Sequence, residues 1–310
     1  MKLHPNVDEL FPVLLNPLAP LDERIRDLYR LKETAAGLAG AHTLIHAVRT
    51  TSSVLLQHEL IYNVGQLRRI ETVPSLTRIA LDTGMDIVSR HEALEALGAI
   101  ASPSTLEVLM EIQNSCRSED SAPLRESAEL AVQRIHWMTV DAARLESPVG
   151  CRFVSIDPVP APDHRLPQPT VSDLGATLLD PEATLWDRYV AMFGLRNVGS
   201  EEAVQLLCHA LRQDTTSCLL RHEVAFVLGQ LEHASSGASL AAAILDGEEH
   251  PMVRHEAAEA LGALATQDGW LVLQQAATDE EDLVKDSCVV ALEMHRYWSK
   301  FKKTEPSTDQ

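Results

Sequence analysis

Four copies of a His-Glu dipeptide are the residues of this sequence that are best suited to chemistry. The copies occupy the same frame of a helical pattern, at His58-Glu59, His91-Glu92, His222-Glu223 and His255-Glu256. Imidazole nitrogen and carboxylate oxygen with open positions suit iron or manganese, and no thiolate belongs to the pattern. Four neighbouring carboxylates would also repel one another unless a cation lay among them. The motif therefore predicts a metal site.

The spacing of the copies indicates an internal duplication. The interval from His58 to His91 equals the interval from His222 to His255, so the second pair repeats the first at one constant offset. A period of about 33 residues, as seen here, is typical of solenoids built from helical repeats. We therefore expect two copies of a two-motif unit that face each other and hold a pair of metal ions between them.

The same period continues beyond the four motifs. In the flanking segments, the place of the motif histidine is taken by Ile25, Glu126, Tyr189 and Asp286. Eight repeats result, four in each half, and only the middle two of each half carry His-Glu. Because the outer repeats lack the pair, His-Glu is not a packing requirement of the repeat itself.

Local signals place each motif histidine in the second turn of a helix. The residue five positions earlier is a candidate N-cap in each copy: Ser53, Asp86, Ser217 and His250. Ser and Asp side chains accept the free N–H groups of a first turn, and Pro251 after His250 is tolerated there. A glycine follows each histidine at one fixed distance, at Gly65, Gly98, Gly229 and Gly262. Glycine weakens a helix, so we expect these positions to admit a neighbouring helix closely.

A proline-rich stretch separates the two halves. Residues 141–175 contain six prolines, and proline cannot continue a helix. We therefore predict an N-terminal repeat half at 1–140, a Pro-rich linker at 141–175 and a C-terminal repeat half at 176–300. Residues 301–310 are predicted to form a polar tail.

Composition limits the classes of partner. The chain has 310 residues and a net charge of −19, which argues against nucleic acid and favours a cationic partner or a well-solvated surface. Its five cysteines show no C-x-x-C pair, which indicates reduced thiols inside the cell. The N-terminal residues lack the apolar core of a signal peptide, and no run approaches the ~18 apolar residues of a membrane span. We expect a cytoplasmic protein with no membrane association.

Several residues near the motifs have more than one interpretation. Glu95 and Glu259 lie one turn after their motif histidines, where they could form a salt bridge, lie at a solvated rim or orient the histidine. The arginines that precede three motifs are expected to form ion pairs between repeats rather than bind anions: Arg90, Arg221 and Arg254. Gln66 and Gln230 occupy matching positions in the two halves, and we expect them to form hydrogen bonds on the helix surface.

Taken together, the four motifs in two symmetric pairs resemble the deoxyhypusine hydroxylase family. The run that begins His250-Pro-Met-Val-Arg-His-Glu and the linker segment Val154-Ser-Ile-Asp-Pro-Val-Pro-Ala-Pro are also similar to that family, and the likeness spans nearly the whole chain. It implies an all-α, HEAT-like helical repeat solenoid of eight helical hairpins in two pseudo-symmetric halves. HEAT-like repeats alone are less specific, because phycobilin lyases and many scaffolds share them.

The resemblance also implies an activity. The chain would be a di-iron monooxygenase that uses two Fe²⁺ ions, with O2 as co-substrate, to hydroxylate the deoxyhypusine side chain of eukaryotic initiation factor 5A to hypusine. Glu59 and Glu223 would be catalytic residues that bind the cationic amines of the substrate. The iron ligands would be His58, His91, Glu92, His222, His255 and Glu256. The alternative is a non-catalytic HEAT-repeat scaffold with a structural metal site.

Overall fold

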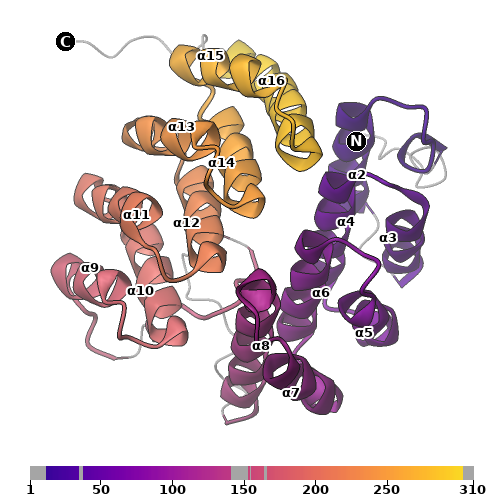
Figure 1. The fold of residues 1–310 in the computed structure, drawn as a ribbon, viewed down its shortest axis with the longest axis vertical. Coiled ribbons are helices and arrows are strands. Elements are labelled where there is room, and N and C mark those ends of the chain that lie inside the picture. The colour runs from indigo at the N-terminus through magenta and orange to yellow at the C-terminus, as the bar shows by residue number, and fades with distance from the viewer. Residues whose placement is uncertain (1–11, 35–37, 141–152, 154, 164–165, 303–310) are drawn as a thin grey trace, which may run out of the picture. The chain divides into compact units, whose positions relative to one another are not determined.

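The computed structural model describes residues 12–34, 38–140, 153, 155–163 and 166–302. The chain divides into two compact units, residues 1–159 and 160–310. Within the described ranges each unit consists of helices and contains no strand (Figure 1), so the predicted all-α class is confirmed. Residues 141–152 of the predicted linker and residues 303–310 of the predicted tail lie outside the described residues.

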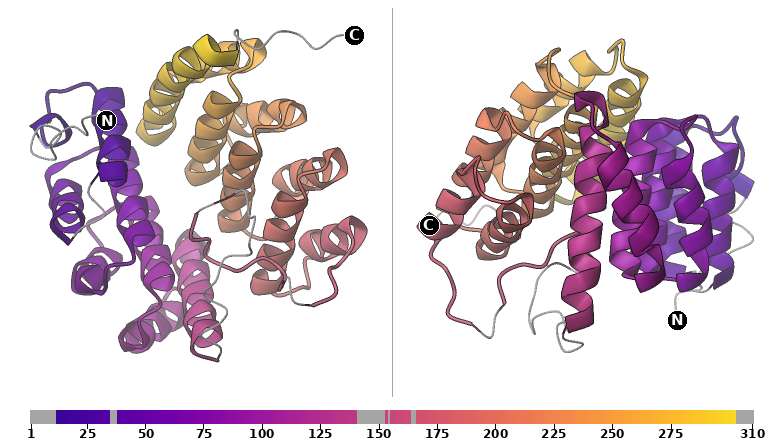
Figure 2. Two further views of the ribbon diagram at one scale, coloured as in Figure 1. Left: turned by 180° about the vertical axis from the view of Figure 1, so that it is seen from behind. Right: turned by 60° about the horizontal axis from the view of Figure 1, so that its bottom comes forward.

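Unit 1 is a stack of helical hairpins in which the second helix of each hairpin forms an inner layer. The inner helices are α2 (Leu21–Thr34), α4 (Val54–Leu67), α6 (Ile87–Ile100) and α8 (Ala122–Val140). The outer helices are α3 (Leu38–Thr50), α5 (Val73–Leu81) and α7 (Leu106–Ser115). Short helices lead into α5, α7 and α8: η1 (Ile70–Thr72), η2 (Pro103–Thr105) and η3 (Glu119–Ser121). Inner helices contact their inner neighbours, and each outer helix contacts the inner helix that follows it (Figure 2).

Unit 2 repeats this plan with four complete hairpins. Its inner helices are α10 (Leu185–Val198), α12 (Cys218–Leu231), α14 (Pro251–Leu264) and α16 (Asp282–Lys302). Its outer helices are α9 (Val171–Leu179), α11 (Glu201–Gln213), α13 (Gly237–Leu245) and α15 (Gln267–Ala276), and η5 (Ala234–Ser236) precedes α13. All eight positions of the repeat frame, from Ile25 to Asp286, fall on inner helices. This agreement confirms the predicted repeat period.

The first and last helices of unit 2 cross boundaries drawn from the sequence. Helix α9 begins at Val171, inside the range predicted as linker. The cause is a capping box, in which Thr170 and Asp173 satisfy each other's backbone N–H groups. Helix α16 continues to Lys302, which lies inside the range predicted as tail.

The predicted N-caps form as expected in all four motif helices. The Ser53 and Ser217 hydroxyls accept the N–H groups of Leu56 and Leu220 at 3.3 and 2.9 Å. Asp86 accepts the Val88 N–H at 2.8 Å. In α14 the cap is a ring nitrogen, because His250 Nδ1 accepts the Met252 N–H at 3.2 Å. Each motif histidine is thereby fixed in the second turn of its helix.

The motif glycines lie where inner helices approach most closely. A Cβ atom at Gly65 would lie 2.9 Å from the Ala96 Cα, and a Cβ atom at Gly229 would lie 3.1 Å from the Ala260 Cα. Gly98 and Gly262 face Ala131 and Ala291 in the same way. The predicted reason for these glycines is confirmed: Gly against Ala brings the helices that carry the motifs together.

Replacement of Gly262 with alanine is expected to destabilise the protein. The new Cβ would lie 2.8 and 2.9 Å from the Ala291 Cβ and Cα, and neither atom can move without a shift of the α16 backbone. We expect a loss of about 1–3 kcal/mol from overpacking, despite the better helix propensity of alanine. Thermal denaturation followed by circular dichroism measures it. Gly247→Ala is the control, since nothing lies within 4 Å of its Cβ position; equal stability of the two variants would contradict close packing.

In half of the eight repeats, an arginine just before the repeat position connects the two helices of the hairpin. In four repeats its Nε donates to the carbonyl ten residues earlier, at 2.9–3.1 Å: Arg24 to Leu14, Arg90 to Ala80, Arg188 to Leu178 and Arg254 to Ile244. The last three of these carbonyls lie at the ends of outer helices, where acceptors lack partners within the helix. The arginine therefore connects the two helices of its own repeat, a contact that was not predicted from the sequence.

The predicted ion pairs between repeats form at two of the three motif arginines. Arg221 pairs with Glu249 at 2.7 Å, and Arg254 pairs with Asp279 at 2.5 Å. Arg90 differs, because the bond that its guanidinium makes is to a main-chain carbonyl rather than to an acidic side chain. The ion pairs thus reinforce the stacking mainly in unit 2.

A further ion pair in unit 2 is predicted to make stability pH-dependent. Arg188 and Asp214 meet at 2.6 Å with both side chains 4% exposed. Burial would raise the pKa of the Asp214 carboxyl, but hydrogen bonds from Arg188, Thr216 and the Ser217 backbone lower it below its usual value. Because the folded-state pKa is the lower one, the pair stabilises the fold above pH ~4 and loses this contribution as pH falls through the folded-state pKa.

Asp214→Asn should therefore cost about 3 kcal/mol near neutral pH, because it leaves the buried Arg188 charge unpaired. The difference from the parent protein should shrink as the pH falls below ~4. Urea unfolding at several pH values measures both quantities. Asp22→Asn is the control, since the Asp22–Arg26 pair is partly exposed and should contribute less than about 1 kcal/mol. A pH-independent difference for Asp214→Asn would contradict the assignment.

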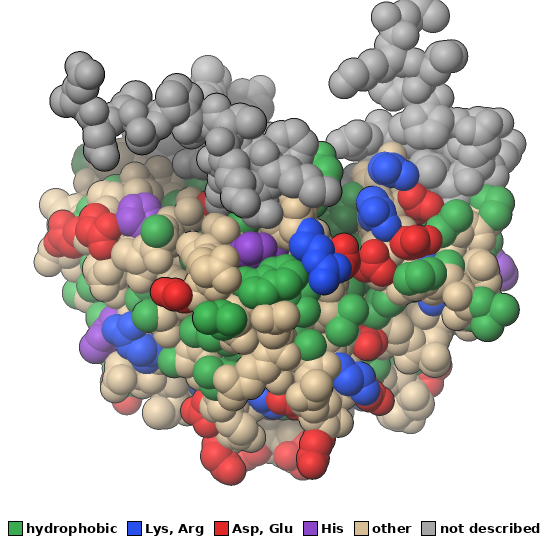
Figure 3. All heavy atoms as spheres, turned by 90° about the horizontal axis from the view of Figure 1, so that it is seen from above, with side chains coloured by type: hydrophobic (Ala, Val, Ile, Leu, Met, Phe, Trp, Pro, Cys, Tyr) green, Lys and Arg blue, Asp and Glu red, His purple; other side chains and the backbone are tan. Residues whose placement is uncertain are grey.

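The surface and the cysteines agree with the composition. On the face drawn in Figure 3, acidic side chains are spread among apolar and basic ones rather than gathered in a single patch. The described cysteines form no disulfide bond with one another: Cys116, Cys208, Cys218 and Cys288. Cys151 lies outside the described residues. Among the described helices, none is both long and apolar enough to cross a membrane.

Candidate metal centre

The four motif histidines are all buried on inner helices. His91 and His255 have no exposed surface, and His58 and His222 are 5% and 4% exposed. Their positions follow from the capped helix starts and from the Gly–Ala contacts, which set the distance between α4 and α6 and between α12 and α14. The local sequence therefore positions an imidazole pair in each unit.

In unit 1 the histidines of α4 and α6 form one cluster with a carboxylate. The ring centroids of His58 and His91 are 5.8 Å apart. Glu92 Oε2 lies 3.2 Å from His58 Nε2. One donor atom from each of His58, His91 and Glu92 can be chosen so that all lie within 4.8 Å of one another. The three unit 1 residues predicted as metal ligands are thus brought together.

Unit 2 reproduces this arrangement on α12 and α14. The ring centroids of His222 and His255 are 5.4 Å apart, and Glu256 Oε2 lies 3.5 Å from His222 Nε2. The carboxylates of Glu256 and Glu259 lie with His255 in a second group whose donor atoms are within 4.8 Å of one another. Each unit therefore holds two imidazoles and the predicted carboxylate. That the two half-sites share one dinuclear centre stays a prediction.

Glu95 and Glu259 lie against the histidine one turn before them. Glu95 Oε1 is 3.8 Å from His91 Nδ1, and Glu259 Oε1 is 3.5 Å from His255 Nδ1. Their side chains are 12% and 18% exposed, so neither belongs to a solvated rim. A carboxylate next to Nδ1 favours a proton there and leaves Nε2 to act as a ligand.

The cluster in unit 1 attracts positive charge. Burial would lower the pKa of the His58 imidazole, but hydrogen bonds and charge interactions with Glu59 and Glu92 raise it well above its usual value. Buried carboxylates that favour the imidazolium form would equally favour a metal cation in its place. The donor set also fits iron: among the described residues, the candidate groups within either unit contain His and Glu and no Cys.

Glu59 and Glu223 are buried beside the clusters, at 4% and 3% exposure. Glu59 Oε1 is 3.5 Å from His58 Nδ1, and Glu59 Oε2 accepts a hydrogen bond of 2.5 Å from the Tyr29 hydroxyl. Tyr29 was not predicted as a site residue. The available signal was that Tyr29 and Phe193, which occupy matching positions of the duplication, differ by a single hydroxyl.

The matched glutamines have different partners. In unit 1 the Gln66 amide bonds both to the N–H and to the carbonyl of Ile156, at 2.8 and 3.2 Å. In unit 2 the Gln230 carbonyl oxygen accepts a hydrogen bond of 2.9 Å from Arg196. The predicted hydrogen-bonding role is confirmed, and Gln66 anchors the segment that follows α8.

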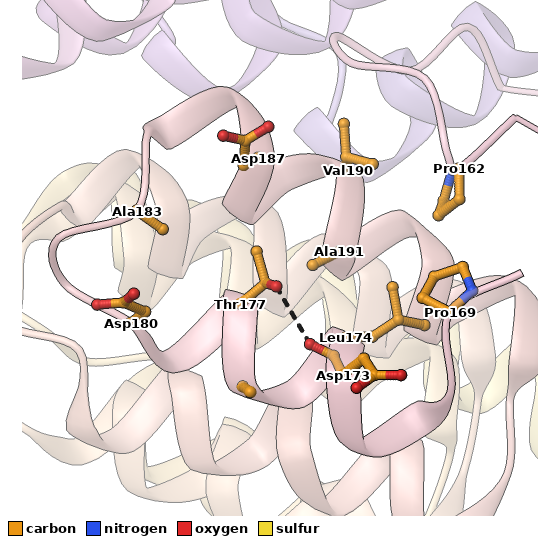
Figure 4. Close-up of a pocket in the computed structure, with 11 residues that line it drawn as sticks. Pro162, Pro169, Asp173, Leu174, Thr177, Asp180, Ala183, Asp187, Val190 and Ala191 are labelled. Carbon is orange, nitrogen blue, oxygen red and sulfur yellow. Dashed lines mark hydrogen bonds between the residues drawn. The ribbon is translucent and has the colours of Figure 1, made fainter.

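A hollow of ≈ 550 Å³ on unit 2 is distinct from the motifs (Figure 4). Its lining comes from α9, α10 and the loops beside them, and it includes Asp173, Asp180 and Asp187. Asp173 and Asp187 accept hydrogen bonds from the capping residues Thr170 and Thr184. These two carboxylates are therefore accounted for by helix capping.

Comparison with known families identifies the repeats. The family described as HEAT repeats matches residues 212–293, and that described as PBS lyase HEAT-like repeat matches residues 89–115 and 187–213. The HEAT-like class predicted from the sequence is therefore confirmed.

Relatives that match over most of their length include deoxyhypusine hydroxylases. The chain is 40% identical to deoxyhypusine hydroxylase of Homo sapiens over 291 residues, which are 94% of this chain and 91% of the relative. It is 38% identical to deoxyhypusine hydroxylase-B of Oryza sativa subsp. japonica over 300 residues, which are 96% of both chains. The solved structure of human deoxyhypusine hydroxylase in complex with glycerol matches with a TM-score of 0.85 and 39% identity, over 95% of this chain and 97% of that one.

Proposed function

The chain belongs to the deoxyhypusine hydroxylase family, and from this premise we propose that it is an iron- and O2-dependent monooxygenase acting on a protein substrate. The substrate would be the deoxyhypusine side chain of eukaryotic initiation factor 5A, and the product hypusine. The observation that carries the proposal is the buried His-His-Glu cluster that occurs once in each unit. Similarity to enzymes over more than nine-tenths of the chain disfavours the scaffold alternative.

The proposed iron ligands are the donors that each unit gathers. Unit 1 would supply His58, His91 and Glu92, and unit 2 would supply His222, His255 and Glu256. Three protein ligands per ion leave coordination positions for water and O2, which an oxygenase needs. When bound, the two ferrous ions would supply the electrons and the O2 activation that insertion of an oxygen atom into a C–H bond requires.

The remaining carboxylates would orient ligands and substrate. Glu95 and Glu259 lie on the Nδ1 side of His91 and His255, so they would hold the Nε2 atoms toward the metal. Glu59 and Glu223 would bind the substrate, which is a lysine extended by an aminobutyl group and carries two cationic amines. Two buried carboxylates suit two ammonium groups, because buried charges require partners.

Turnover by the purified protein tests this proposal. The chain loaded with Fe²⁺ is incubated under O2 with initiation factor 5A that carries deoxyhypusine, and a chemical reductant supplies the two electrons that each further turnover requires. The mass of the modified peptide is then measured by mass spectrometry. The proposal predicts a gain of one oxygen atom, derived from O2 when isotopically labelled gas is supplied. The unmodified factor, which carries lysine, is the control and should not change. An iron-loaded chain that leaves deoxyhypusine unaltered would contradict the proposal.

We also propose that the reaction takes place in the cytoplasm. The acidic balance of the chain, −19, suits a cationic side chain as substrate, because complementary charge accelerates encounter. It also agrees with the expectation that neither nucleic acid nor a membrane is a partner.

A further inference from the structure

The two units differ in a hydroxyl group that lies next to Glu59, one of the two glutamates proposed to bind the substrate. In unit 1 the Tyr29 hydroxyl, on α2, donates to Glu59 Oε2 at 2.5 Å. The residue at the matching position of the duplication in unit 2 is Phe193 on α10. A second pair one turn after the motif histidines shows the same change, from Tyr62 to Phe226. At these two matched positions the phenol is therefore found in unit 1 and a phenylalanine in unit 2.

The surroundings of the two equivalent positions also differ. Tyr29 is 43% exposed and Phe193 is fully buried. The Phe193 ring packs edge-on against Tyr189 at 6.3 Å and under the Arg196 guanidinium at 4.7 Å. Phe193 thus belongs to the apolar core of unit 2, whereas the Tyr29 ring lies at the surface and reaches inward with its hydroxyl.

The bond to Tyr29 engages one oxygen of the Glu59 carboxylate while His58 lies against the other. Oε2 accepts from the phenol, and Oε1 lies 3.5 Å from His58 Nδ1. A hydrogen bond to an ionised group is short and strong, and it restricts the rotation of the carboxylate. A carboxylate held in this way cannot swing freely toward a nearby metal ion.

We propose that Tyr29 is a positioning residue that holds the Glu59 carboxylate for a substrate ammonium group and prevents it from becoming a metal ligand. The inference rests on the proposed function, in which Glu59 binds one amine of deoxyhypusine. Phe193, at the matching position of unit 2, has no hydroxyl and can make no such bond.

Tyr29→Phe tests the inference, because it removes only the hydroxyl and gives unit 1 the residue of unit 2. We expect the KM for the deoxyhypusine protein to rise roughly tenfold, the loss expected for one charge-assisted hydrogen bond. We expect kcat to change by less than about threefold. Iron content, measured by elemental analysis, should equal that of the parent protein. Tyr297→Phe, which removes an exposed phenol on α16, is the control and should leave KM unaltered.

A double-mutant cycle separates positioning from a structural effect. Substrate affinity is measured by calorimetry without O2 for Tyr29→Phe, Glu59→Gln and the combined variant. If Tyr29 acts through Glu59, the tyrosine change has no further effect once Glu59 is replaced. Additive losses, an unchanged KM in Tyr29→Phe, or loss of iron from Tyr29→Phe would overturn the inference. Failure of the proposed function is recognised separately, because the parent protein would then neither bind nor hydroxylate deoxyhypusine.

Discussion

His58→Ala is expected to remove iron from the protein and to lower kcat by about 10³-fold or more. The reason is that a metal ligand is lost, and a bound metal ion contributes several kcal/mol of transition-state stabilisation. The helical fold should persist, since the core is formed by the Leu and Ala faces of the inner helices, such as Leu60, Leu94 and Leu97. Elemental analysis, turnover and circular dichroism of the same sample measure the three properties.

His295→Ala is the matched control for this variant. His295 is also a buried histidine of an inner helix, 7% exposed, but its Nε2 bonds to the Thr266 carbonyl at 2.8 Å rather than to a motif carboxylate. Its replacement should cost stability while iron and turnover are kept. If His58→Ala retained full iron, or if both variants lost iron equally, His58 would not be a specific ligand.

Glu59→Gln and Glu92→Gln are expected to have different effects, although both residues follow a motif histidine in unit 1. Glu92 lies 3.2 Å from His58 Nε2, so its replacement should release iron. Glu59 lies on the Nδ1 side of the same ring and accepts the Tyr29 hydroxyl. Its replacement should keep iron and raise the KM for the deoxyhypusine protein by about 10–100-fold, as expected when a buried charge loses its partner.

Iron content and KM, measured on both variants, distinguish the two roles. The amide is nearly isosteric with the carboxylate, so folding should be unaffected in each. Loss of iron from Glu59→Gln, or normal iron content in Glu92→Gln, would show that the roles of metal ligand and substrate-binding residue are assigned to the wrong glutamates.

The features that could be predicted from the sequence are those that repeat. The repeat period placed every repeat position on an inner helix, and the caps Ser53, Asp86 and Ser217 behaved as their side chains dictate. The glycine of each motif could be interpreted because it recurs at the same position in all four copies. Glycine weakens a helix, so its repeated use indicated that a neighbouring helix approaches closely there. A pattern that occurs in four copies arises by chance much less often than one that occurs once.

Features that depend on the partner of a side chain were not predictable in this way. Arg24, Arg90, Arg188 and Arg254 bond to carbonyls ten residues away, a contact that hairpin geometry creates and that composition does not reveal. Helices α4, α6, α12 and α14 end in left-handed residues that are not glycine: Arg68, Ala101, Glu232 and Ala265. Such conformations are unfavourable locally for residues other than glycine, so the residue types did not indicate them.

The contact between Tyr29 and Glu59 is also one that the sequence did not predict. Its hydroxyl and the Glu59 carboxylate come from different helices, 30 residues apart in the chain. The motif spacing identified the histidines and carboxylates because the duplication repeats them. It did not reveal Tyr29, since the duplication does not repeat the phenol.

The electronic state of the bound iron tests the central claim, that each half supplies the ligands of one ion in a shared dinuclear centre. Metal analysis of the iron-loaded, oxidised chain should give about two irons per molecule, and Mössbauer spectroscopy should show a pair that is magnetically coupled, as in two-metal sites. Glu256→Ala, in unit 2, should then also alter the signal of the ion held by unit 1. Two uncoupled ferric ions that respond only to substitutions in their own half would contradict the account.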